Sequence, residues 1–176
     1  MNSDTYSDQA SRDSYNIGRN EFDSAILEHV KIPNNSTVLE VGCGDGRFIR
    51  NLTKVNNTLK ITGLDASDAG IYCCKDIGCD LICCDILSYS VTDKYDYVLC
   101  FQTLEHFSNP DEVVEKLKSL GKNIIISVPN KELDKCTEHL QFWDVTEFEK
   151  YMNTYINGKA ILIDSNQNIL FISEIL

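Results

Sequence analysis

A short apolar strand that runs directly into alternating glycines is the feature of this sequence that most constrains its fold. Thr37–Val41 (TVLEV) has the composition of a buried strand, and residues 42–46 (GCGDG) place a glycine at every second position. Residues 46–54 then follow helical spacing. Glycines between a strand and a helix allow a tight turn and a close approach of a ligand to the backbone. This arrangement predicts an α/β sheet with a ligand at the carboxyl end of an early strand.

Strands and helices alternate along the rest of the chain. Apolar periodicity predicts helices at residues 21–30, 67–75, 110–120 and from 144 onward, and further strands at 59–64, 80–84, 95–101 and 123–128. The last two predicted strands, 160–164 and 169–175, have no helix between them. Because helical crossovers join parallel strands and hairpins join antiparallel ones, we predict a mostly parallel α/β sheet that ends in a hairpin.

Two helix starts carry specific signals. Asn109 stands before Pro110 and two acidic residues, so we expect Asn109 to be the N-cap. Asp144 and Glu147 have the spacing of a capping box. Both signals place helix starts where the alternation of elements requires them.

Charge and cysteine usage exclude several classes of protein. The formal net charge of −11 argues against a partner that is bound through nucleic-acid phosphates. The first twenty residues lack the order of a signal peptide, and no apolar run is long enough for a membrane span. We therefore expect a cytoplasmic protein with reduced cysteines and no membrane partner. A zinc site usually has cysteine pairs with two residues between them, or histidines. The cluster Cys73, Cys74, Cys79, Cys83 and Cys84 has neither, so we predict no metal.

Acidic residues stand at or near the ends of three successive predicted strands. Glu40 lies two residues before Gly42, Asp65 ends the second strand, and Asp85 follows the third. A carboxylate beside the glycines repels a pyrophosphate but can hold an ammonium group, while the other two can accept hydrogen bonds from ribose and adenine. A dinucleotide loop also requires glycine where this chain has Arg47, so an NAD-linked oxidoreductase is disfavoured.

These residues resemble the class I S-adenosylmethionine-dependent methyltransferases, in particular the small-molecule branch that includes ubiquinone-type O-methyltransferases. Residues 38–46 (VLEVGCGDG) are similar to the family's first motif almost letter for letter, and 64–67, 84–86, 95–106 and 124–130 resemble later ones. The resemblance implies S-adenosylmethionine as cofactor. It also implies a Rossmann-like, doubly wound, seven-stranded, mostly parallel sheet with an antiparallel C-terminal hairpin strand. The cofactor contacts that it implies are Glu40, Gly42, Cys43, Gly44, Asp45, Gly46, Asp65, Ala66, Asp85, Ile86, Phe101 and Gln102.

The length of the chain favours a single domain, and the resemblance suggests how that domain is divided. We expect one domain over residues 1–176, as a monomer or a homodimer, with a flexible arm or lid at 1–18. Residues 19–130 are the predicted cofactor-binding half, and 131–176 the half that faces the acceptor and completes the sheet. Related enzymes often use an N-terminal segment as a lid, and Arg19 would then pair with the cofactor carboxylate, although a solvated arginine is the alternative.

Methyl transfer is an in-line displacement at a carbon that the sulfonium already activates. The protein mainly aligns the reactants, and an oxygen or nitrogen acceptor can need a base. His106, after the fourth strand, and His139, in the segment that would cover the acceptor, are the candidate catalytic residues. A loop-fixing hydrogen bond at His106 and packing of His139 on Trp143 are the structural alternatives. The predicted function is methyl transfer to a small-molecule acceptor, and a non-catalytic, cofactor-binding or partner-binding relative is the alternative.

Overall fold

The computed structural model describes residues 9–68, 78–131 and 133–174, with side chains described from residue 19 onward. Seven strands form one sheet: β1 (Thr37–Val41), β2 (Lys60–Asp65), β3 (Asp80–Cys83), β4 (Tyr95–Phe101), β5 (Gly121–Pro129), β6 (Gly158–Ile163) and β7 (Asn168–Ser173). Their order is β3-β2-β1-β4-β5-β7-β6. The first five strands pair in parallel, and β7 runs antiparallel between β5 and β6. The predicted Rossmann-like, doubly wound sheet with an antiparallel C-terminal hairpin strand is therefore confirmed.

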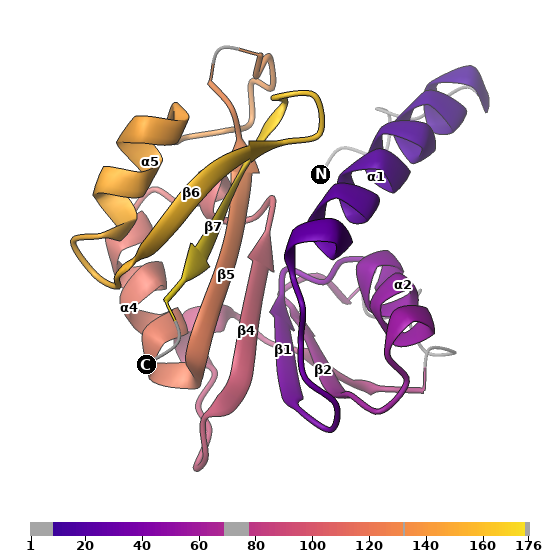
Figure 1. Cartoon of the computed structure of the whole chain (residues 1–176), viewed down its shortest axis with the longest axis vertical. Helices are drawn as coiled ribbons and strands as arrows, with labels where there is room; N and C mark the ends of the chain where they lie inside the picture. The colour runs from indigo at the N-terminus through magenta and orange to yellow at the C-terminus, as the bar shows by residue number, and fades with distance from the viewer. Residues whose placement is uncertain (1–8, 69–77, 132, 175–176) are drawn as a thin grey trace.

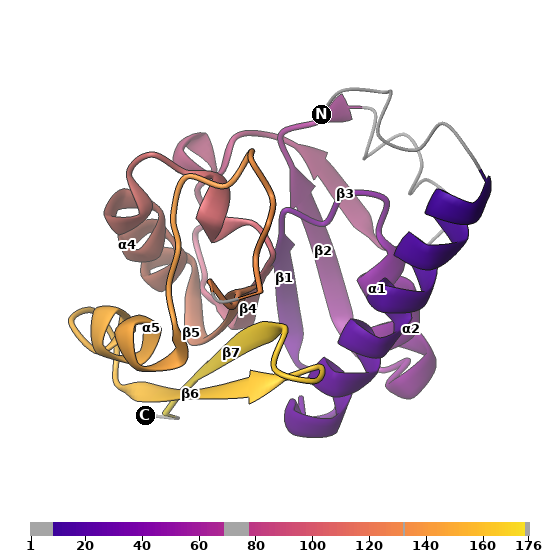
Figure 2. The same cartoon turned by 90° about the horizontal axis from the view of Figure 1, so that it is seen from above.

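Helices cover both faces of the sheet (Figures 1 and 2). On one face lie α1 (Gln9–His29) and α2 (Arg47–Val55), and on the other lie α4 (Pro110–Leu120) and α5 (Val145–Met152). Short 3-10 turns η1 (Ile86–Ser88) and η2 (Leu104–His106) follow β3 and β4. Each helix contributes an apolar stripe, such as Phe48, Ile49 and Leu52 of α2, to one of two buried clusters. The sequence order reverses between β1 and β4, where such sheets bind ligands.

Several helix predictions are confirmed and others need correction. Asp144 and Glu147 form the predicted capping box at α5. Asn109 lies at the N-cap position of α4, but its side chain makes no capping hydrogen bond and instead contacts Glu112 at 3.3 Å. The first helix begins at Gln9 rather than at residue 21, so the predicted flexible arm is helical from Gln9 onward. The helix predicted at 67–75 lies almost entirely outside the described residues.

For membrane spans and thiols, the structure can be compared with the expectations only over the described residues. Within the described ranges, no helix has the length and apolarity that crossing a membrane requires. The described cysteines 43, 79, 83, 84, 100 and 136 are free thiols. Cys73 and Cys74 of the disfavoured zinc reading lie outside the described residues.

Candidate functional site

The glycine loop after β1 is a tight turn held against β2. The Gly42 and Cys43 N–H groups both donate to the Leu64 carbonyl, at 2.8 and 3.1 Å, and Gly44 N–H donates to Asp65 Oδ2 at 2.7 Å. Gly42 has φ +74°, and a Cβ there would lie 2.2 Å from Thr103 Oγ1. Gly44 has φ +51°, and a Cβ there would meet no atom within 4 Å. The turn therefore excludes a side chain at Gly42 by contact and leaves open space above Gly44.

Glu40 places a buried carboxylate beneath this loop. Its exposed fraction is 5%, and its Oε2 atom has no hydrogen-bond partner. Burial raises the pKa of Glu40 well above its ordinary value, and the nearby Asp23 carboxylate adds to the rise. A buried carboxylate oxygen without a partner is costly, and a cationic ligand group would supply the missing partner. The predicted ammonium contact of Glu40 fits this arrangement.

Asp65 and Asp85 both bind backbone N–H groups where the sequence places them, at and after strand ends. Asp65 accepts from Gly44 N–H through Oδ2 and from Ser67 N–H through Oδ1, at 2.7 and 2.8 Å. Asp85 Oδ1 accepts from Leu87 N–H at 2.8 Å and caps η1. Carboxylate oxygens have further lone pairs, so both side chains can still accept from a ligand. Ala66 is exposed beside Asp65, while Ile86 is buried.

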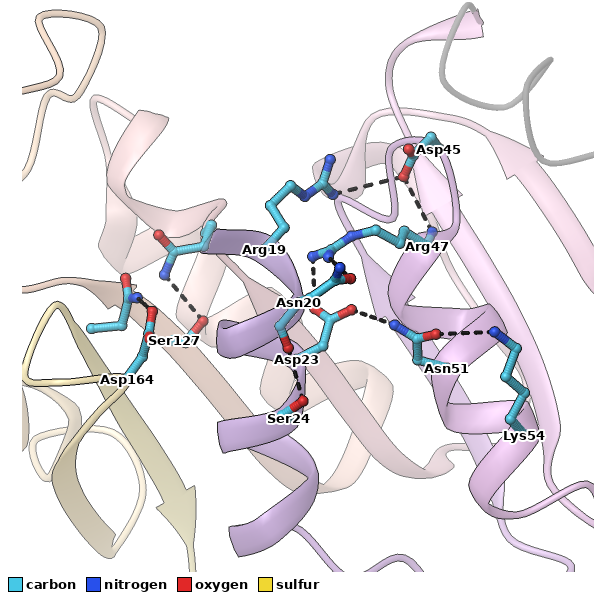
Figure 3. Close-up of polar contacts among 12 residues, drawn as sticks. Arg19, Asn20, Asp23, Ser24, Asp45, Arg47, Asn51, Lys54, Ser127 and Asp164 are labelled. Atoms are coloured by element: carbon cyan, nitrogen blue, oxygen red, sulfur yellow. Dashed lines mark hydrogen bonds and ion pairs between the residues drawn. The ribbon is translucent and has the colours of Figure 1, made fainter. Parts of the chain in front are cut away.

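A polar network fastens α1 over the glycine loop (Figure 3). Asp23 is buried, and its carboxylate lies 2.8 Å from Arg47 Nη2 and accepts from Asn51 Nδ2 at 2.7 Å. Burial raises the pKa of Asp23, and the Arg47 charge opposes that rise. Arg19, which lies nearer the N-terminus of α1, is 3.7 Å from Asp45 of the loop. The network thus brings Arg19 beside the glycine loop, with an Asp23–Arg47 pair that sequence analysis did not predict.

The end of β4 supplies the wall opposite the loop. Phe101 is buried and packs edge-to-face on Phe48, with 4.9 Å between ring centroids. Gln102 has φ +48°, an uncommon conformation for a residue with a side chain. Its backbone N–H donates to the Ser127 carbonyl at 3.0 Å and its Nε2 donates to Ser127 Oγ at 3.3 Å. These bonds across to β5 hold the strained residue at the end of β4.

The two histidines proposed from the sequence come together. The rings of His106 and His139 are 4.8 Å apart between centroids. The N–H groups of Leu140 and Gln141 both donate to the Glu105 carbonyl, at 2.8 and 3.1 Å, so the segment after β5 lies against η2. In Figure 2 this segment, in orange, passes beside the turn that follows β4. Burial lowers the pKa of His106, and His139 lowers it further.

Sequence reasoning missed two carboxylates at this histidine pair. Glu105 is 1% exposed, and burial raises its pKa to about 8. Asp134 Oδ2 lies 2.6 Å from His139 Nδ1, with only 5% of the Asp134 side chain exposed. Glu105 directly precedes His106 in the sequence, and this adjacency could have identified Glu105 as a candidate site residue. The ring contact of His139 is with His106, and the ring contacts of Trp143 are with Phe148 and Tyr151.

A family model matches most of this chain. The model of one protein family, described as methionine biosynthesis protein MetW, matches residues 19–150. A bifunctional methionine biosynthesis protein, MetXA/MetW, from Rhodopirellula baltica is 27% identical over 133 residues, which are 70% of this chain and 21% of that protein. The chain thus spans about a fifth of the length of that relative.

Solved structures share the architecture. A crystal structure of a SAM-dependent methyltransferase from Aquifex aeolicus has a TM-score of 0.72 at 17% identity, over 86% of this chain and 88% of that one. The plantazolicin methyltransferase BpumL in complex with SAH has a TM-score of 0.61 at 26% identity, over 85% of this chain and 70% of that one. Since the family model covers most of the chain, the protein belongs to the MetW family and has the class I S-adenosylmethionine-dependent methyltransferase fold.

Proposed function

We propose that this protein binds S-adenosylmethionine at the carboxyl ends of β1, β2 and β3 and transfers the methyl group to an oxygen or nitrogen atom of a small-molecule acceptor. The observation that carries the proposal is the Glu40 carboxylate, which is buried beneath an open glycine turn with one oxygen unpartnered. Because burial disfavours the charged form of Glu40, a positively charged ligand group beside it would stabilise that carboxylate.

Each proposed contact has a distinct physical role. Glu40 would hold the ammonium group, and the backbone at Gly44 would lie close to the ligand because no Cβ intervenes. Asp65 would accept from the ribose hydroxyls, while Asp85 and the backbone of Ile86 would contact adenine. Arg19, already at the loop through Asp45, would bind the carboxylate. Cys43, Asp45 and Gly46 complete the cradle.

Phe101 and Gln102 would line the site near the transferred methyl group. The bound cofactor supplies a methyl carbon that its sulfonium has already activated. The chain's own part is to exclude water, through the buried Phe101, and to hold the acceptor in line. His106 and His139 would contact the acceptor or take its proton as it is methylated. The acceptor would lie against residues 130–143, and this short segment suits a small molecule.

Binding and turnover test the proposal separately. We expect S-adenosylhomocysteine to bind the full chain in calorimetry, and Glu40→Gln to weaken binding of S-adenosylmethionine about 30-fold or more, since removing one partner of a buried charge pair costs about 2 kcal/mol or more. Glu28→Gln, an exposed change on α1, is the matched control. Absence of cofactor binding to the wild-type chain would refute the proposal.

One comparison favours a second candidate function. The Rhodopirellula relative carries its MetW-like part within a larger bifunctional protein. A part of that kind can serve a protein partner, so we also propose a cofactor-responsive partner-binding unit as the alternative. Cofactor binding without release of S-adenosylhomocysteine across a panel of alcohols, phenols, amines and carboxylates would favour this alternative over catalysis.

A further inference from the structure

A group of potential metal ligands lies in η2 and in the segment after β5 that packs against it. Among the described residues, Glu105, His106 and His139 are the one set of three His, Cys, Asp or Glu side chains whose ligand atoms lie within 4.8 Å of one another. Ligand atoms that bind one zinc ion at about 2.0–2.2 Å are separated by at most about 4.4 Å. Small side-chain movements would therefore bring all three onto one ion.

The Glu105 carboxylate lacks any other partner. Both of its oxygens are buried and neither has a hydrogen bond. The backbone N–H groups of Thr103 and Glu105 lie near enough to favour the ionised form, but they do not reach either oxygen in hydrogen-bond geometry. A buried carboxylate in this state is costly unless a cation is bound.

One of the two histidines is already oriented by a second contact. His139 Nδ1 lies 2.6 Å from Asp134 Oδ2, which leaves Nε2 for another partner. The backbone of Glu138 lies close to the His106 ring and opposes the lowering of the His106 pKa. Histidines that bind metals almost always use their other nitrogen in this way, toward a carboxylate or a carbonyl group.

We propose that Glu105, His106 and His139 bind one divalent transition-metal ion such as Zn²⁺, with Asp134 as a positioning residue. Two imidazoles and a carboxylate are a known zinc ligand set, and three protein ligands leave a coordination position open. His106 is exposed, so solvent or a small molecule can reach that position. The ion would lie close to the cofactor loop, because Thr103, two residues before Glu105, contacts Gly42.

The consequence for catalysis rests on the proposed function. The open position would take a hydroxyl oxygen of the acceptor, whose proton leaves to water. The oxygen lone pair then forms the bond to the methyl carbon, and the electrons of the C–S bond return to sulfur. In this arrangement His106 and His139 would act as metal ligands instead of taking the proton of the acceptor, and an oxygen acceptor would be preferred over nitrogen.

Metal content measured without any activity assay tests the site. Tag-free full-length protein with reduced thiols is dialysed against Zn²⁺ and then against buffer, and zinc is counted by mass spectrometry. We expect one Zn²⁺ per chain in the wild type and in His29→Gln, an exposed histidine outside the cluster. Glu105→Gln and His139→Gln should lose the ion, and Asp134→Asn should weaken it about 10–100-fold.

Controls separate this result from misfolding and from thiol binding. Each variant is titrated with S-adenosylhomocysteine, so that retained cofactor binding shows an intact fold and cofactor failure is scored apart from metal failure. Co²⁺ replaces zinc to report ligands, because thiolate ligands give charge-transfer bands that nitrogen and oxygen ligands do not. A wild type that retains no zinc, zinc binding unchanged in Glu105→Gln and His139→Gln, or a Co²⁺ spectrum with thiolate bands would overturn the proposal.

Discussion

Two glycines of the loop are constrained by different forces. At Gly42, a side chain would collide with Thr103. At Gly44, a side chain would have open space, and only the positive φ disfavours it. We expect Gly42→Ala to destabilise the fold by about 3 kcal/mol, from left-handed strain plus overpacking. Gly44→Ala should cost only about 1–2 kcal/mol, from strain alone, yet weaken cofactor binding strongly. Urea unfolding and calorimetry on both variants measure the contrast, and equal stability losses would contradict it.

Asp96 gives the stability of the fold a defined pH dependence. Hydrogen bonds from Lys122 and from Thr37 lower the pKa of Asp96 to about 2. A lowered pKa in the folded state means that the stabilisation is present above the ordinary value of 3.8 and is lost as pH falls through about 2. We expect Asp96→Asn to cost about 1 kcal/mol at pH 7, a figure reduced because the side chain is partly exposed.

Unfolding of the wild type and of Asp96→Asn between pH 7 and pH 2 measures this effect. The stability difference between them should shrink toward zero at the acid end. Asp93→Asn, an exposed change in the loop before β4, is the control and should change stability little at any pH. A difference that stays constant down to the acid end would disprove the assignment.

At the scale of elements, a buried ion pair helps to dock α1 on α2. Asp23 accepts from Arg47 and Asn51 of α2, and its loss leaves the 17%-exposed Arg47 side chain without that carboxylate. We expect Asp23→Asn to destabilise the protein by about 2–3 kcal/mol and to raise hydrogen exchange in residues 19–29 before other segments. Glu28→Gln should do neither. Uniform acceleration of exchange across the sheet would show that the pair does not act on α1 specifically.

Elements were predictable where neighbours in sequence decide the outcome. The strand Thr37–Val41, the glycine turn and the Asp144 capping box follow from local patterns, and the structure confirms them. The predicted start of α1 is wrong. The polar composition of the first residues suggests a flexible arm, whereas the backbone is helical from Gln9. The Asp23–Arg47 pair and the contact of Glu105 with residues 140–141 join distant parts of the chain, and no local pattern encodes such pairs.

At the scale of the whole molecule, ligand binding should appear as a shift in thermal unfolding. A ligand at about 100 times its dissociation constant stabilises the folded state by about 2.7 kcal/mol. For a chain of this size that corresponds to a rise in Tm of about 5–10 °C. We expect S-adenosylhomocysteine to give this rise and NADH to give none, because Glu40 disfavours a pyrophosphate. A rise with NADH alone would favour the oxidoreductase reading instead.

The place of β7 in the sheet has a consequence for how the protein is made. β7 is the last strand in the sequence, yet it lies between β5 and β6 and pairs with both. While a ribosome has released the chain only through β6, one edge of the mostly buried strand β5 has no antiparallel neighbour. Unpaired edges of that kind favour association between chains. The newly synthesised protein is therefore most prone to aggregate just before residues 168–173 emerge.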